Sequence, residues 1–420
     1  MNKKLGLAVA GALVAFASTA NAGITIPAGD WTVDIGGNVN AYYSNTRFSG
    51  VTKSANAGSP SSQTANMVST GLLPSALGIG AKTRQNDLDI AFQFTFFTGL
   101  NSNGGMGSSS GLAGANGADG NSLNIRQAYM TVGDASWGQI KMGRDLGVFA
   151  SDAILSDMTL LGVGQGAGGS GSSTLGRIGS GYLYADWVGQ IAYSTPNWNG
   201  FQATASIREP WGNSANHSLG FEGKLTYDFA VNDVTGRVWA SGVHQKTRTA
   251  DQAGYWALPA GTAIEGDPVY VDAVTGVERT AEAWDIGAKV AYSGAELVGY
   301  YYEGQNIGTA AIIHSNVTPA TGLLYNAPAG GDQDTSGGYV QATFKIPGVG
   351  TKLGASWGES NIQTTNGTFS DRSWIVGAYH PLTKSLNVVA EYTDTKYENV
   401  NTAGDSGKAR TMSLGAIMFF

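Results

Sequence analysis

The chain has 420 residues and contains 62 glycines, no cysteine and only 13% charged residues. Without cysteine, neither disulfide bonds nor thiolate metal sites can form. The acidic residues outnumber the basic ones by seven, which makes nucleic acid an improbable partner. No stretch beyond residue 22 approaches 18 consecutive apolar residues, and this excludes a protein that crosses a membrane with helices.

The N-terminus has the features of a secretion signal. Lys3 and Lys4 precede an apolar run at 5–17, and Ala20-Asn21-Ala22 is a small-residue cleavage site. We predict that residues 1–22 are a signal peptide, which is removed when the chain leaves the cytoplasm. Loss of the two lysines gives the mature chain a formal charge of about −9.

The rest of the chain repeats a short pattern of alternating apolar and polar residues. In residues 87–98, Leu88, Phe92 and Phe96 fall on one face of a strand, and Asp89 and Gln93 fall on the other. Segments of this kind, about 9 to 11 residues long, have the length that a tilted strand needs to span a bilayer. Since only a closed barrel satisfies every strand backbone in lipid, the pattern predicts an all-β transmembrane β-barrel over 23–420.

We count sixteen such segments, which predict a 16-stranded antiparallel barrel. They lie near 31–44, 73–83, 87–98, 123–133, 137–144, 182–195, 200–209, 217–229, 234–245, 281–292, 295–304, 337–345, 351–359, 371–380, 385–395 and 409–420. Seven short connections alternate with eight long ones, as expected when both termini are periplasmic. A barrel of this size is too wide for side chains to fill, so we expect an aqueous channel.

The long connections are predicted to be loops. They surround 45–72, 99–122, 145–181, 210–216, 246–280, 305–336, 360–370 and 396–408. Two of them, at 101–121 and 162–173, are rich in Gly, Ser, Ala and Asn and cannot bury enough apolar area to fold alone. The chain is therefore expected to be one domain.

Three stretches carry a resemblance to a known family. The sequence from Asn124 to Gly133, with Trp137 to Arg144 after it, resembles the fourth and fifth strands of Gram-negative general porins, most closely those of beta-proteobacterial type. The stretch from Gln190 to Phe201 is similar to the next porin strand and its turn. The last strand ends in an aromatic residue, Phe420, which the family uses as an assembly signal.

The resemblance implies an outer-membrane homotrimer without cofactors, in contact with outer-membrane lipid and lipopolysaccharide and folded by the barrel-assembly machinery. It also implies a loop, Asp145 to Ser180, that folds into the barrel and narrows the pore, where Ser156-Asp157-Met158 matches the acidic segment. Two positions depart from the family pattern. Neutral residues replace the basic wall expected on the first two strands, and Leu161 replaces a second acidic residue of the loop.

Seven charged residues are candidates for the pore constriction. They are Asp145, Asp152, Asp157, Arg126, Lys141, Arg144 and Arg177. We expect Asp157 to face a basic wall of Arg126, Arg144 and Arg177, so that a transverse field orients dipolar solutes. The alternative is that Asp157 only pins the loop by hydrogen bonds. The overall acidity is explained either by solvated loops or by a pore with a modest cation preference.

We predict passive diffusion of ions and small hydrophilic solutes, with a substrate-specific channel that binds its solute weakly as the alternative. An enzyme or an adhesin built on a barrel is less well supported. The Gly107-to-Gly111 stretch fits a nucleophile elbow but lacks the flanking strand and helix. The four histidines are scattered, so no metal site is expected. Asp332 and Asp334 are expected to be solvated, with weak calcium binding as the alternative.

Overall fold

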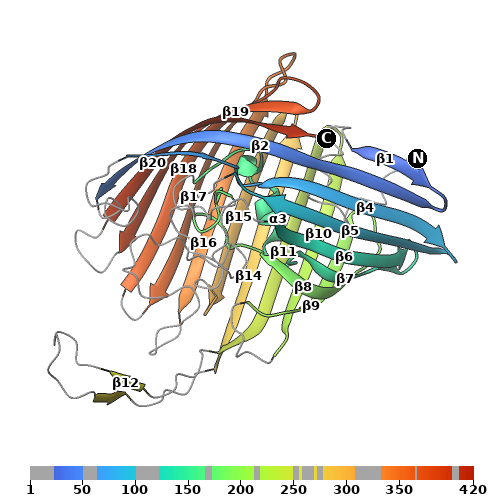
Figure 1. The fold of residues 1–420 in the computed structure, drawn as a ribbon, viewed down its shortest axis with the longest axis horizontal. Helices are drawn as coiled ribbons and strands as arrows, with labels where there is room; N and C mark the ends of the chain where they lie inside the picture. Colours follow the sequence, from blue (N-terminus) through green and yellow to red (C-terminus); the bar gives the residue numbers. More distant parts are fainter. Residues whose placement is uncertain are drawn as a thin grey trace.

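Sixteen strands close into a single antiparallel barrel in the computed structural model (Figure 1). The structure describes residues 23–50, 64–100, 123–165, 173–211, 218–248, 255–257, 269–271, 278–307, 333–364, 367–399 and 406–420. The barrel strands are β2 (Trp31–Gly50), β4 (Ser75–Gln85), β5 (Leu88–Thr98), β6 (Asn124–Asp134), β7 (Gly138–Leu146), β8 (Trp187–Ser194), β9 (Phe201–Arg208), β10 (Gly220–Val231), β11 (Val234–Arg248), β14 (Glu278–Tyr292), β15 (Ala295–Gln305), β16 (Asp334–Lys345), β17 (Lys352–Thr364), β18 (Gly367–Pro381), β19 (Leu386–Asn399) and β20 (Ser406–Phe419).

The barrel closes where the last strand pairs with the first. Strand β20 runs antiparallel to β2, with a register from Asn38 opposite Phe419 to Gly50 opposite Gly407. The backbones of Gly37 and Phe420 exchange two hydrogen bonds, 2.9 and 3.1 Å long, at the end of this seam. The first described residues, which pair with β2 at Ile35, and Phe420 therefore lie at the same end of the barrel, which also carries the short turns (Figure 1). We call it the turn end.

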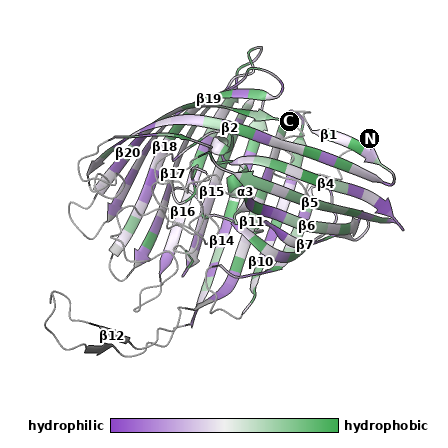
Figure 2. Cartoon of the chain, in the orientation of Figure 1, coloured by the Kyte–Doolittle hydropathy of each residue, from purple (hydrophilic) through white to green (hydrophobic). Residues whose placement is uncertain are grey.

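Alternation along each strand separates two faces, as Figure 2 shows by the alternating green and purple bands. Large apolar side chains such as Trp374 and Met412, 60% and 65% exposed, point outward. The residues between them point inward and are mostly polar and buried, for example Ser373, Thr411 and Ser413. A strand with an apolar outward face and a polar inward face matches a barrel that meets lipid outside and water inside.

Shorter elements complete the fold. They are β1 (Ile24–Ala28), β3 (Thr64–Ser69), the hairpin of β12 (Tyr255–Ala257) and β13 (Val269–Val271), the helix α3 (Ser151–Leu155) and the 3₁₀ turn η1 (Met158–Leu161). Neither α3 nor any other helix in the described part of the chain has the length and apolar character needed to cross a membrane.

The sixteen predicted strands are confirmed, but several boundaries were wrong. Strand β8 begins at Trp187 instead of 182, because Tyr182 and Leu183 are buried inside the barrel. The predicted loops at 45–72, 360–370 and 396–408 contain strand residues that extend β2, β17, β18, β19 and β20. Beyond the apolar band both faces of a strand are polar, so the alternation that marks a strand in the sequence disappears there.

The connection between β3 and β4 turns inward and was missed in the sequence. Ser69 pairs with Tyr42 and Ala76 pairs with Asn38, so the six residues 70–75 stand opposite only the three residues 39–41 of β2. We call residues 70–75 the inward bulge. The Asn40 side chain holds it, because it accepts from the Gly71 N–H (2.9 Å) and donates to the Leu73 carbonyl (3.0 Å).

Candidate functional site

The described residues of the connection between β7 and β8, 147–165 and 173–186, lie inside the barrel. They bond to inward-facing side chains along β10 to β19, and Figure 1 shows α3 enclosed by the strands. The Tyr339 hydroxyl donates to the Ala153 carbonyl (2.8 Å), and Gln341 accepts from the Met158 N–H (2.7 Å) and donates to the Ser156 carbonyl (2.9 Å). We call residues 147–165 and 173–186 the inward segment.

A buried ion pair fixes the start of the inward segment. Arg208 Nη1 lies 2.7 Å from Glu222 Oε1, and both side chains are fully buried. The other Glu222 oxygen accepts from the Val148 N–H (2.8 Å), and the Arg208 guanidinium lies 4.0 Å from the centre of the Trp211 ring. A buried carboxylate that is paired and accepts a backbone N–H is well satisfied, so this contact is structural.

Asp152, on α3, is held by two basic side chains of the wall. Its carboxylate lies 2.7 Å from Lys224 Nζ and 3.0 Å from Arg237 Nη1, and Arg237 also binds Asp228 through Nε (2.6 Å) and Nη2 (2.7 Å). Burial raises the pKa of Asp152, but the charges of Lys224 and Arg237 outweigh it, so that the pKa lies below its ordinary value. The four groups together carry no net charge.

Asp157 forms hydrogen bonds to other residues of the inward segment. Its carboxylate accepts from the N–H groups of Thr159 (2.9 Å) and Arg177 (3.2 Å) and from the Tyr182 hydroxyl (2.7 Å), and the residue is only 4% exposed. It caps η1 through the bond to Thr159. Of the two roles considered from the sequence, the geometry agrees with pinning, and the expected face-to-face arrangement with a basic wall across a gap was wrong.

Arg177 joins the inward segment to the wall and does not line a channel. Its fully buried guanidinium donates to the Ser356 hydroxyl (2.5 Å), the Ser180 carbonyl (3.2 Å) and the Ser373 hydroxyl (3.1 Å). Burial lowers its pKa to about 10, although the charge of Asp157 opposes this shift. A guanidinium with several well-placed acceptors is a strong anchor, because its planar donors reach two strands at once.

A carboxylate that we missed in the sequence holds the far side of the inward segment. Glu391, on β19, accepts from the N–H groups of Val163 and Gly164, both at 2.8 Å, and from the Tyr379 hydroxyl at 2.6 Å. A Cβ at Gly162 would lie 2.0 Å from Glu391 Oε1, so a larger residue there would force the Glu391 carboxylate to shift. The strand alternation places Glu391 as a single charged residue on the inward face, but the sequence does not indicate which residues it binds.

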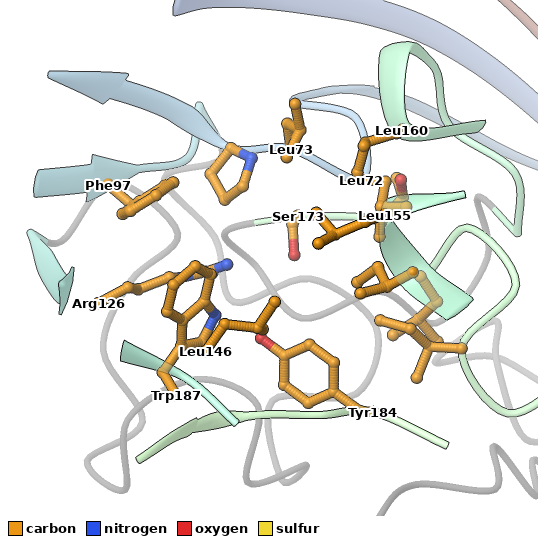
Figure 3. Close-up of a pocket in the computed structure, with 15 residues that line it drawn as sticks. Leu72, Leu73, Phe97, Arg126, Leu146, Leu155, Leu160, Ser173, Tyr184 and Trp187 are labelled. Atoms are coloured by element: carbon orange, nitrogen blue, oxygen red, sulfur yellow. The ribbon is translucent and has the colours of Figure 1, made fainter. Parts of the chain in front are cut away.

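The inward bulge meets the inward segment across the barrel. The Leu72 N–H donates to the Gly162 carbonyl (2.8 Å), and the Thr174 N–H donates to the Gly71 carbonyl (3.0 Å). Apolar side chains from both elements and from the wall pack around a cavity of about 30 Å³ (Figure 3). Part of the interior is thus filled by side chains, which the strand count alone did not predict.

Arg126 lines this cavity together with Phe97, Trp187 and Tyr184 (Figure 3). It sits where β5 and β6 slip in register, and its guanidinium carbon lies 5.0 Å from the centre of the Phe97 ring. The residue is buried, so the structure places it within the packing between wall and inward segment, not on the basic face that we expected opposite Asp157.

The last three candidates lie on β7 and divide between its two faces. Asp145 points inward, where it accepts from Gln127 Nε2 (2.9 Å) and pairs with Lys141 (2.5 Å). Arg144 precedes Asp145 in the chain and therefore points to the opposite, outward face, which it shares with Ile140 and Met142. The residue is exposed there. The expectation that Arg144 belongs to an inner basic wall was therefore wrong, and the alternation of β7 could have excluded it.

Among the described residues, no group of three His, Asp or Glu side chains could hold a metal ion. Asp332 and the stretch from Gly107 to Gly111 lie outside the described residues. The described histidines, His244 and His380, are 136 positions apart in the chain, on β11 and β18.

Comparison with known proteins identifies the family. A family model described as Gram-negative porin matches residues 8–400. No curated protein matches the sequence. Among solved structures, the outer membrane channel DcaP of Acinetobacter baumannii is similar with 14% identity and a TM-score of 0.64, covering 95% of this chain and all of DcaP.

Two further structures share the fold. Salmonella typhi OmpF in complex with daunomycin has 18% identity and a TM-score of 0.53, covering 94% of this chain and all of OmpF. The trimer form of OmpT, an outer membrane protein of Vibrio cholerae, has 13% identity and a TM-score of 0.51, covering 93% of this chain and 99% of OmpT. The chain belongs to the Gram-negative porin family and forms an outer-membrane channel for passive diffusion.

Proposed function

We propose that the protein is a general, size-limited channel for ions and small hydrophilic solutes, narrowed by the inward segment as a fixed element. The observation that carries this proposal is the set of bonds between that segment and the wall. Glu222, Asp152, Arg177 and Glu391 hold it at successive points from β10 to β19. A segment anchored so often sets a constant cross-section instead of opening and closing.

We infer that the candidate residues serve this narrowing in two ways. Asp145, Asp152, Asp157, Arg126 and Arg177 are buried, and through their bonds and packing they define where the inward segment lies. Lys141 is partly exposed and contributes charge on the inward face. The family and this architecture support transport without a chemical reaction, so we propose that the protein is not an enzyme.

Further proposals concern export and assembly. We propose that residues 1–22 are cleaved as a signal peptide, which leaves the barrel at 23–420. We also propose that Phe420, whose backbone bonds to Gly37 at the closing seam, is the signal for the barrel-assembly machinery. The trimer form of OmpT supports a homotrimer, in contact with outer-membrane lipid and lipopolysaccharide.

The test is conductance of the purified protein in planar bilayers, combined with liposome swelling in sugars of increasing size. A general channel gives steady steps in KCl and swelling rates that fall smoothly with solute size. Saturable block by one solute would instead favour a substrate-specific channel, and absence of conductance by the folded barrel would contradict both. Deleting Phe420 should lower the amount of assembled barrel without lowering secretion.

A further inference from the structure

Three lysines gather on the inward face near the turn end. Lys289 lies on β14, Lys345 ends β16 and Lys352 begins β17. Each occupies an inward strand position, since Lys289 is opposite Arg237 in the register and Lys352 is opposite both Lys345 and Tyr379. Like charges placed directly opposite each other on neighbouring strands are destabilising, so packing does not explain this arrangement.

No described carboxylate forms an ion pair with Lys289, Lys345 or Lys352, whereas Lys224 and Arg237 are both paired. Glu296, on β15, acts electrostatically on Lys352, as do the buried carboxylates of Asp157 and Glu391 and the ammonium of Lys289. The Lys352 ammonium lies 5.0 Å from the centre of the Tyr379 ring. Asp157 and Glu391 are buried and bound to the inward segment, so the groups of this cluster that remain accessible are the three lysines and Glu296, with a formal charge of +2.

The cluster lies next to the inward segment, on its turn-end side. Lys289 shares a register row with Gln341, through Val298, and Gln341 binds the Met158 backbone. Gly354, two residues from Lys352, lies against Met158, because a Cβ there would be 2.5 Å from Met158 Sδ. Solutes at this end of the narrowing therefore meet partly exposed ammonium groups.

We propose that Lys289, Lys345 and Lys352 form a binding site for small anionic solutes, those with phosphate or carboxylate groups, and that the channel prefers anions. This inference rests on the proposed channel function. Fixed charges along a narrow, partly desolvated water path concentrate ions of opposite sign and are screened less than in bulk water. The net charge of the chain suggested a cation preference, but the candidate carboxylates Asp145, Asp152 and Asp157 are buried in structural contacts.

The first test is the reversal potential of the full barrel in a KCl gradient. The wild type should be anion-selective, and the double variant Lys289→Gln with Lys352→Gln should shift toward cations. Glu296→Gln should shift in the opposite direction, because it removes the partly exposed carboxylate near the cluster. The matched control is Lys408→Gln, on the outward face of β20, which removes the same charge outside the lumen and should leave selectivity unchanged.

The second test is block by inorganic phosphate. Phosphate should reduce the wild-type KCl conductance in a saturable way, and the double variant should lose most of this block. Circular dichroism and heat-modifiability confirm that each variant has folded. A cation-selective wild type, or a double variant with unchanged selectivity and phosphate block, would overturn the anion site while leaving the channel intact. A folded barrel without KCl conductance would instead refute the channel function itself.

Discussion

Two sets of charged residues share the inward face of this barrel and differ in what they touch. At the level of the inward segment, Glu222, Asp285 and Glu391 each accept a backbone N–H from it. Near the turn end, Lys289 and Lys352 meet no such backbone group and remain partly exposed. An inward strand position alone therefore does not reveal whether a charge holds the protein together or meets solutes. The position of the charged residue along the barrel axis, relative to the inward segment, distinguishes the two roles.

The largest effect should follow from breaking the buried pair at the start of the inward segment. Glu222→Gln leaves the Arg208 guanidinium buried without its counter-charge, which typically costs about 3–5 kcal/mol. We expect the free energy of unfolding, measured by denaturant titration in detergent, to fall by about that amount. The double variant Arg208→Met with Glu222→Gln is the control and should lose less. Equal losses in both variants would contradict the pairing.

A smaller effect is expected at the other end of the segment. Glu391→Gln can keep its carbonyl oxygen as the shared acceptor for Val163 and Gly164, but its amide nitrogen cannot accept from the Tyr379 hydroxyl. The loss of charge-assisted bonds should cost about 1–3 kcal/mol. Single-channel recordings should show added noise as the segment loosens, with little change in reversal potential. A quiet channel of unchanged stability would show that Glu391 is not an anchor.

Asp157→Asn separates pinning from selectivity. The asparagine can still cap Thr159, but its amide nitrogen cannot accept from Arg177 or the Tyr182 hydroxyl, so the free energy of unfolding should fall by about 1–2 kcal/mol. The reversal potential should stay near that of the wild type because the carboxylate is buried. Tyr182→Phe, which removes one of the same bonds without changing charge, should give a similar channel. If the reversal potential of Asp157→Asn instead shifted markedly toward anion selectivity, the result would support the transverse field expected from the sequence.

The smallest effect concerns acid pH. Because the pKa of Asp152 lies below its ordinary value of 3.8, the ionised carboxylate stabilises the folded state at pH values above that value. This contribution is lost as the pH falls through the lowered pKa. The difference in melting temperature between wild type and Asp152→Asn should therefore be constant from pH 7 to about 5 and shrink only below about pH 4. A difference that vanishes near pH 6 would contradict the assignment.

The strand architecture could be predicted from the sequence because its cause is local. One face of every strand meets an apolar exterior, so Leu88, Phe92 and Phe96 repeat with a period of two wherever a strand spans it. The same period assigns Arg144 to the outward face with Met142, and that signal was present but overlooked. Where the strands extend beyond the apolar band the period weakens, and there the boundaries were wrong.

The partners of the inward charges were decided only by the tertiary structure. Gly164 and Glu391 are 227 positions apart, and Asp152 and Lys224 are 72 apart, so no spacing in the sequence connects them. Barrel closure and the path of the inward segment bring them together, and burial then converts acidic residues from apparent selectivity groups into anchors. Sequence alone thus determined that a barrel forms and which residues face inward. Which of these hold the segment and which meet solutes depends on contacts that exist only after folding.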